Sequence, residues 1–147
     1  MMTGIRMRQV TATDLPQISR FLEENGLPTI GVEKFFENFI VALDQNGSWV
    51  GIAGLEVYGK NGLLRSVAVD EHFRGMGYGR TLVNTVLASA REKGIEAIYL
   101  LTESAEDYFK GLGFEVVNRE DMDAAVRVSP EFTECRETAP SMRKFIG

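Results

Sequence analysis

Cysteine and histidine are almost absent from this chain, which has one of each, Cys135 and His72, among 147 residues. A single cysteine excludes a disulfide within the chain, and these two residues cannot supply the ligand set of a usual structural zinc site. We therefore expect no metal and a reducing, cytoplasmic setting. Cys135 is expected to be chemically inert, and His72 to be an exposed loop residue.

Long apolar runs and an excess of positive charge are also missing. No stretch approaches the roughly 18 uninterrupted apolar residues of a membrane span, and residues 1–6 lack the apolar region of a signal peptide. The formal net charge of −5 argues against non-specific binding to nucleic acid or to an anionic membrane, because both favour a basic protein surface. We therefore expect neither nucleic acid nor a membrane as a partner.

Length and apolar content favour a single domain over residues 1–147. A chain of 147 residues with 44% hydrophobic content can bury one core but is too short for two ordinary domains. The apolar periodicity predicts the order β-α-α-β-β-β-α-β-α-β, then an extra segment over 119–140 and a final strand. This order implies an α/β (α+β) fold, with a mixed, mostly antiparallel sheet of about six to seven strands and helices on both faces. The expected strands cover residues 5–10, 39–43, 49–58, 63–69, 97–102, 114–118 and 142–146.

Three glycines in five residues follow one of these strands, in the run Arg74-Gly75-Met76-Gly77-Tyr78-Gly79. An amphipathic helical pattern over 80–93 comes next, so the run is typical of a strand, a tight turn and a helix. Glycine lets the backbone approach a ligand closely, and the N–H groups at a helix N-terminus can then point at one anion such as a pyrophosphate. The spacing is neither that of a dinucleotide fingerprint nor that of a P-loop, and a plain helix start remains the alternative.

The pattern R-x-x-G-x-G in this run resembles the acetyl-CoA site of the GCN5-related N-acetyltransferase (GNAT) superfamily. A second block, Ala105 to Phe114, resembles the A-x-x-x-Y-x-x-x-G-F block of the same family and stands at the expected separation. The resemblance is strongest over residues 50–117. It implies the GNAT fold and an enzyme that transfers an acetyl group from acetyl-CoA to an amine.

Carried over to this sequence, the resemblance implies a donor site built largely from backbone. The glycine-rich run should bind the pyrophosphate, while the strand edge at 67–69 pairs with the pantetheine amides and offers an N–H to the thioester oxygen. Arg74 and Arg80 would supply positive charge nearby. Thr102 stands where many relatives carry an asparagine that binds the pantetheine arm, and Phe109 would pack near the sulfur. The expected acetyl-CoA residues are Val67, Ala68, Val69, Arg74, Gly75, Met76, Gly77, Tyr78, Gly79, Arg80, Thr102 and Phe109.

Glu56 interrupts an otherwise apolar strand and is our candidate general base, since an ammonium must lose a proton before it attacks a carbonyl. If residues 59–62 form a simple loop, Glu56 lies opposite Arg65 across the hairpin. Arg65 would then bind the carboxylate of an α-amino acid acceptor, with Ser66 as a weaker neighbour. The alternative is a purely structural ion pair between Glu56 and Arg65.

The candidate acid for the departing thiolate is Tyr108. Many family members use a tyrosine one residue later, where this chain has Phe109. The apolar spacing of residues 105, 108, 109 and 112 predicts that both aromatic side chains face the core.

A narrower resemblance rests on Leu100-Leu101-Thr102 followed by Ala105 and Phe109, together with the long tail that carries Glu131-Phe132 and Cys135. These residues resemble small amino-acid N-acetyltransferases of the N-acetylglutamate synthase type and acetyltransferases associated with arsenic resistance. This resemblance implies a small amine as acceptor, most simply an amino acid or an analogue. The alternatives are an enzyme that acetylates a protein or peptide, and a non-catalytic acetyl-CoA sensor. The segment 119–140 contains a helix start at Ser129 to Phe132 and either lines the acceptor site or packs against the sheet or a second subunit. A homodimer remains open.

Overall fold

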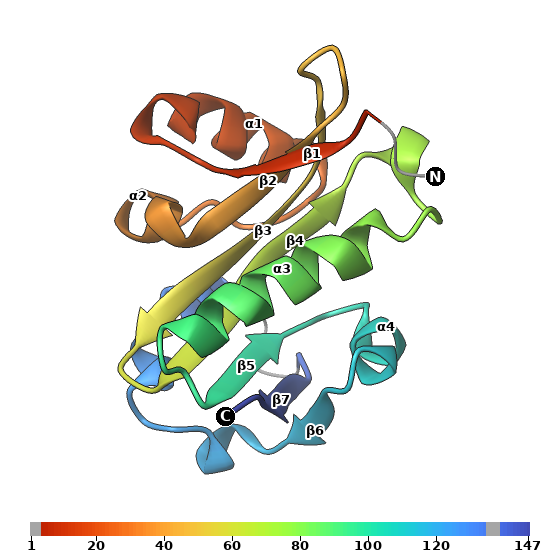
Figure 1. Cartoon of the computed structure of the whole chain (residues 1–147). Helices are drawn as coiled ribbons and strands as arrows, with labels where there is room; N and C mark the ends of the chain where they lie inside the picture. Colours follow the sequence, from red (N-terminus) through yellow and green to blue (C-terminus); the bar gives the residue numbers. More distant parts are fainter. Residues whose placement is uncertain (1–3, 135–138) are drawn as a thin grey trace. The chain divides into compact units, whose positions relative to one another are not determined.

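The computed structural model describes residues 4–134 and 139–147 and contains a seven-stranded sheet with the strand order β1-β2-β3-β4-β5-β7-β6 (Figure 1). The pairing of β4 with β5 is parallel, whereas β1 with β2, β2 with β3, β5 with β7 and β6 with β7 are antiparallel. The predicted mixed, mostly antiparallel sheet is confirmed, and so is the predicted element order. The strands are β1 (Arg6–Gln9), β2 (Phe39–Leu43), β3 (Trp49–Tyr58), β4 (Asn61–Val69), β5 (Ala97–Leu101), β6 (Glu115–Val117) and β7 (Ser141–Phe145).

In the described part of the chain, five α-helices and several short 3-10 turns connect these strands. Within residues 4–134 and 139–147, no helix combines the length and apolar character that crossing a bilayer requires. The helices are α1 (Leu15–Glu24), α2 (Val32–Phe35), α3 (Tyr78–Glu92), α4 (Glu106–Gly111) and α5 (Glu131–Glu134).

The chain divides into two compact units, which we describe separately. The first unit contains the residues up to Leu55 and Ser66–Val86, and the second contains Glu56–Arg65 and Leu87–Gly147. Strands β3 and β4 therefore contribute residues to both units, and the two-residue connection between them belongs to the second.

The first unit packs α1 against the apolar residues of β2 and β3. Ile18 and Leu22 recur on one face of α1 and are fully buried, as is Phe39 of β2. The rings of Phe21 and Trp49 lie 5.9 Å apart. The helix ends at Glu24, and Gly26 just beyond it adopts a φ of 70°, a conformation that favours glycine.

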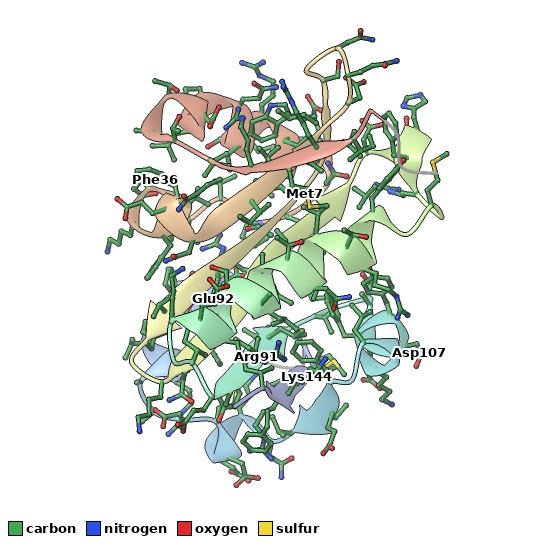
Figure 2. All side chains as sticks on the ribbon, viewed as in Figure 1. Met7, Phe36, Arg91, Glu92, Asp107 and Lys144 are labelled. Atoms are coloured by element: carbon green, nitrogen blue, oxygen red, sulfur yellow. The ribbon has the colours of Figure 1, made fainter. Side chains whose placement is uncertain are left out.

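The second unit packs the segment that follows β6 against the sheet. Met122 and Val126 from this segment are buried with Leu63, Ala97 and Tyr99 in one core cluster. Two long side chains labelled in Figure 2 also bind the backbone of this unit. Arg91 Nε donates to the carbonyl of Ile146 (2.9 Å), and Lys144 Nζ donates to that of Leu112 (2.8 Å). This segment therefore packs on the sheet, as one of the two predicted alternatives required.

The predicted turn between β3 and β4 was wrong in length. β4 begins at Asn61, so the connection is Gly59-Lys60 rather than residues 59–62, with Gly59 at a φ of 64°. The sequence is ambiguous here because Asn61-Gly62 is also a favoured turn pair, and Gly59 already supplies the positive φ that a tight turn needs. The simple register expected from a four-residue loop does not apply.

Candidate active site

The glycine turn, residues 74–79, belongs to the first unit; its residues 74–77 are exposed, whereas Tyr78 is buried at the start of α3. Gly75 and Gly77 have φ values of 80° and 87°, in the left-handed region where other residues are strained. A Cβ atom at either position would meet nothing within 4 Å, so backbone conformation rather than crowding requires glycine. Met76 between them is 57% exposed. The turn therefore presents backbone rather than packed side chains.

The N-terminus of α3 follows this turn directly. The carbonyl of Gly77 accepts hydrogen bonds from the backbone N–H and the Oγ1 of Thr81, both at 3.1 Å. The N–H groups of Tyr78, Gly79 and Arg80 precede the first intrahelical donor, so they are oriented toward the helix end. Positive φ values beside such N–H groups suit a pyrophosphate, and the residues present fit the predicted donor site.

Arg74 lies at the start of the turn and is tied to two other segments of the first unit. Its Nε donates to the carbonyl of Val69 (2.9 Å), and its Nη2 donates to Oδ1 of Asn25 (3.0 Å). The side chain thus links the end of β4 to the end of α1. Its guanidinium has a positioning role for the turn in addition to the charge that the sequence analysis emphasised.

Ser66 holds a strained backbone in the middle of β4. Its φ is 59°, the one positive value of a non-glycine residue within the described part of the chain, and the residue is 7% exposed. Left-handed conformations of such residues cost free energy and are enriched at functional sites. β4 pairs with β5 over Asn61–Leu63 and Ala97–Tyr99. Ser66 comes after this paired stretch and directly before residues 67–69, the segment predicted to face the thioester.

Glu56 and Arg65 form a fully buried ion pair in the second unit. Nη1 of Arg65 donates to Oε2 of Glu56 at 2.8 Å, and neither side chain has any exposed area. The pairing predicted from the sequence is thus present, although the loop that supported it was wrong. The length of the arginine side chain accommodates the changed connection. Burial without a partner would be costly for either charge, so each depends on the other.

Three further residues complete what we call the Glu56 cluster, formed by Glu56, Tyr58, Arg65, Ser129 and Glu131. The Tyr58 hydroxyl donates to Oε1 of Glu56 at 2.5 Å. Nη2 of Arg65 lies 3.8 Å from Oε2 of Glu131, and Ser129 Oγ accepts the Glu131 N–H at 3.1 Å. All five residues belong to the second unit.

Tyr58 is held in its neutral form within this cluster. Burial raises the pKa of the Tyr58 phenol, and the hydrogen bond to the Glu56 carboxylate and its negative charge raise the pKa further. A hydrogen bond with Ser129 and the charge of Arg65 act in the opposite direction. The phenol therefore remains a hydrogen-bond donor to Glu56.

Sequence reasoning missed Tyr58, Ser129 and Glu131 as members of this cluster. Tyr58 could have been predicted from the sequence, because residues two apart on a strand share a face and Glu56 was already a candidate. Ser129 and Glu131 were recognised only as a helix start. Nothing local in the sequence places α5 beside Arg65.

Thr102 and the aromatic pair lie around the start of α4. Thr102 Oγ1 accepts the N–H of Ala105 at 2.9 Å, so this side chain caps the chain entering α4. Phe109 is buried and contacts Phe114, with ring centroids 5.9 Å apart. Tyr108 is 44% exposed, so the expectation that both aromatic side chains face the core was wrong for Tyr108. The helix is only six residues long, and its single buried position is taken by Phe109.

An open hollow of about 440 Å³ adjoins this helix in the second unit. Asp107, labelled in Figure 2, contributes to its rim. The lining residues are Thr102, Glu103, Ser104, Ala105, Glu106, Asp107, Tyr108 and Pro140.

His72, one of the two residues rare in this chain, lies outside these sites. The side chain of His72 is 78% exposed and hydrogen-bonds with Asp70, as expected of a loop residue. Cys135, predicted to be inert, lies outside the described residues.

Comparison with known proteins gives a consistent result. The family model described as "Acetyltransferase (GNAT) family" matches residues 10–114, a range that includes both motifs of the predicted resemblance. An uncharacterized N-acetyltransferase of Chlorobaculum tepidum is 30% identical over 121 residues, covering 78% of this chain and 77% of the relative. The resemblance inferred from the sequence is confirmed.

Two longer proteins are also similar. An amino-acid acetyltransferase of Neisseria meningitidis is 26% identical over 126 residues, covering 80% of this chain but only 29% of the relative. The structure of N-acetylglutamate synthase from Neisseria gonorrhoeae, complexed with coenzyme A and N-acetyl-glutamate, matches with a TM-score of 0.83 at 20% identity. That match covers 97% of this chain and 35% of the synthase, so it concerns the fold of one part of a larger protein.

Proposed function

The chain belongs to the acetyltransferase (GNAT) family, and we propose that its acceptor is the primary amine of a small molecule, an amino acid or a close analogue. As a member of this family it is an acetyl-CoA-dependent N-acetyltransferase. The amine attacks the thioester carbonyl directly, in a complex that holds both substrates. The observation that carries the chemical part of the proposal is the buried ion pair of Glu56 and Arg65.

Acetyl-CoA supplies the acyl carbon, and the glycine turn holds its pyrophosphate. The support is the combination of two glycines at positive φ with the N–H groups that begin α3. Arg80 is exposed beside these groups and adds positive charge. Residues 67–69 would pair with the pantetheine arm, next to the strained Ser66.

Glu56 acts as the general base. Arg65 fixes the orientation of the Glu56 carboxylate, because its Nη1 donates to Oε2 of Glu56 at 2.8 Å. A base is needed since an amino-acid ammonium has no lone pair with which to attack.

The amino-acid acceptor rests on the relatives, one named an amino-acid acetyltransferase and another solved with N-acetyl-glutamate. Arg65 as the residue that binds the acceptor carboxylate stays a prediction. Nη1 of Arg65 contacts Glu56 and Nη2 lies near Glu131, so we assign Arg65 first to its ion pair with Glu56 and only second to the acceptor carboxylate.

The departing thiolate needs less help than the incoming amine. A thiol with a pKa near ~8.5 is a tolerable leaving group, so an acid is an accessory rather than a necessity. Tyr108 is exposed and carries a hydroxyl, so it remains the candidate acid, whereas Phe109 has no proton to donate.

Thiol release from acetyl-CoA by the full chain tests this proposal. The acceptors are free amino acids, their analogues, polyamines and short peptides, and Glu56→Gln is the matched control for chemistry. We expect release with one or more free amino acids or analogues and little with peptides. Release with peptides alone would overturn the acceptor class. Silence with every amine, while acetyl-CoA still raises the melting temperature, would favour a sensor instead.

A further inference from the structure

The proposed base has an access problem. Glu56 has no exposed area, and both of its carboxylate oxygens already accept hydrogen bonds, one from Tyr58 and one from Arg65. A general base must come within hydrogen-bond reach of the proton that it removes, directly or through one intervening group. Some other group must therefore connect Glu56 to the acceptor.

Tyr58 is the member of the Glu56 cluster that is partly exposed, whereas Glu56, Arg65, Ser129 and Glu131 are buried. It stands two residues after Glu56 on β3, so both side chains project from the same face of the strand. Its hydroxyl already points its proton at Oε1 of Glu56. The phenol oxygen thus contacts the buried carboxylate and belongs to a side chain that is itself partly exposed.

We propose that Tyr58 relays the acceptor's proton to Glu56, and this proposal rests on the proposed function. The acceptor ammonium gives one N–H proton to the phenol oxygen of Tyr58, while the phenol passes its own proton to Oε1 of Glu56. The result is a neutral amine, an unchanged phenol and a protonated Glu56. The amine then forms the C–N bond, the C–S bond breaks with its electron pair on sulfur, and the second nitrogen proton neutralises the thiolate. Glu56 returns its proton to solvent by the same route.

The charges around Tyr58 fit such a relay. Glu56 faces it from its own strand, Arg65 from β4, and Ser129 from the residues before α5. Glu131, the first residue of α5, lies beside Arg65. When Glu56 takes the proton, Arg65 loses its nearest anionic partner but keeps Glu131 at 3.8 Å. A buried guanidinium left without any counter-charge would be costly, so the second carboxylate keeps the protonated state of Glu56 accessible.

Tyr58→Phe tests the relay, because it removes the hydroxyl and keeps the ring. With an amino-acid acceptor near neutral pH, we expect kcat/KM to fall by about 10²-fold or more, while the KM for acetyl-CoA stays the same. The loss should shrink by about tenfold per pH unit as the free amine replaces the ammonium in solution. An acceptor whose amine is already neutral at the assay pH, such as an O-alkyl hydroxylamine, should lose less than about threefold.

Tyr99→Phe is the matched control, because Tyr99 is buried in the same core and has not been assigned to the site. It should leave the pH profile as in the wild type. Equal losses of Tyr58→Phe on neutral and charged amines, or an unchanged pH profile, would show that Tyr58 is only structural.

A measurement on the wild type covers the case in which the variant does not fold. Two protons move together in the relay. A plot of kcat/KM against the fraction of D2O in the solvent should therefore be curved rather than straight. A straight line would indicate a single moving proton and would overturn the relay while leaving the proposed function intact. Absence of turnover with every amine would instead overturn both.

Discussion

The glycine turn and the Glu56 cluster offer opposite kinds of groups to the ligands that we propose for them. The turn offers backbone N–H groups, and a side chain such as Met76 lies in solvent. The cluster consists of largely buried side chains that are hydrogen-bonded or ion-paired to one another. We therefore expect acetyl-CoA binding to depend on backbone conformation, and the proposed acceptor chemistry to depend on the identity of each side chain.

The largest expected effect is that of Glu56→Gln. Losing the carboxylate removes the base but retains the shape of the side chain, so kcat should fall by about 10²–10⁴-fold near neutral pH. Acetyl-CoA binding, which belongs to the other region, should stay the same in a thermal-shift titration. A loss of acetyl-CoA affinity as large as the loss of kcat would mean that acetyl-CoA binding also depends on Glu56, and would contradict the separation of the two roles.

Arg65→Met tests whether the buried pair is structurally essential. The variant leaves Glu56 buried without its guanidinium, which should lower the free energy of unfolding by about 3–5 kcal/mol in urea denaturation. Adding Glu56→Gln to Arg65→Met should recover part of this loss, because the uncompensated charge is then removed. A cost below about 1 kcal/mol for Arg65→Met would show that the pair is weakly coupled.

Gly77→Ala probes the backbone requirement of the glycine turn. At a φ of 87° an alanine is strained, so we expect a loss of about 1 kcal/mol in stability and several-fold weaker acetyl-CoA binding. Met76→Ala is the matched control and should bind normally, since that side chain is exposed. If Met76→Ala weakened acetyl-CoA binding more than Gly77→Ala did, the turn would bind acetyl-CoA through its side chains rather than through its backbone.

The smallest effect belongs to an exposed ion pair, which contrasts with the buried one. The hydrogen bond from Arg8 lowers the pKa of Asp14 to about 2, but the Arg8 side chain is 41% exposed, so solvent screening limits its contribution to under about 1 kcal/mol. Because the folded-state pKa is depressed, this contribution is present above about pH 4 and is lost as the pH falls toward 2. The difference in urea midpoint between the wild type and Asp14→Asn should shrink over that window. A difference that persisted at pH 2 would rule out this ion pair as its source.

The sequence predicted the elements that local patterns determine. β2 and β3 begin and end at the predicted residues, because continuous apolar runs are bounded by turn residues. The glycine turn was also predicted, since glycine can adopt the positive φ that Gly75 and Gly77 have. These features depend only on neighbours in the chain.

The remaining features depend on contacts between distant segments or on short elements. Between Arg65 and Glu131 the chain forms α3, β5, α4 and β6, so no local sequence pattern predicts their contact. Tyr108 was misplaced because α4 is too short for its periodicity to distinguish adjacent positions. The shorter turn at Gly59-Lys60 was missed because two glycines compete for the same role.

The acceptor class is the central claim, and a competition assay tests it most directly. The wild-type chain is incubated with acetyl-CoA and an equimolar mixture of free amino acids and short peptides, and the products are identified by mass spectrometry. The account predicts an acetylated free amino acid, formed at a rate that Glu56→Gln sharply reduces. Acetylated peptides alone, or no product while acetyl-CoA binds, would contradict it.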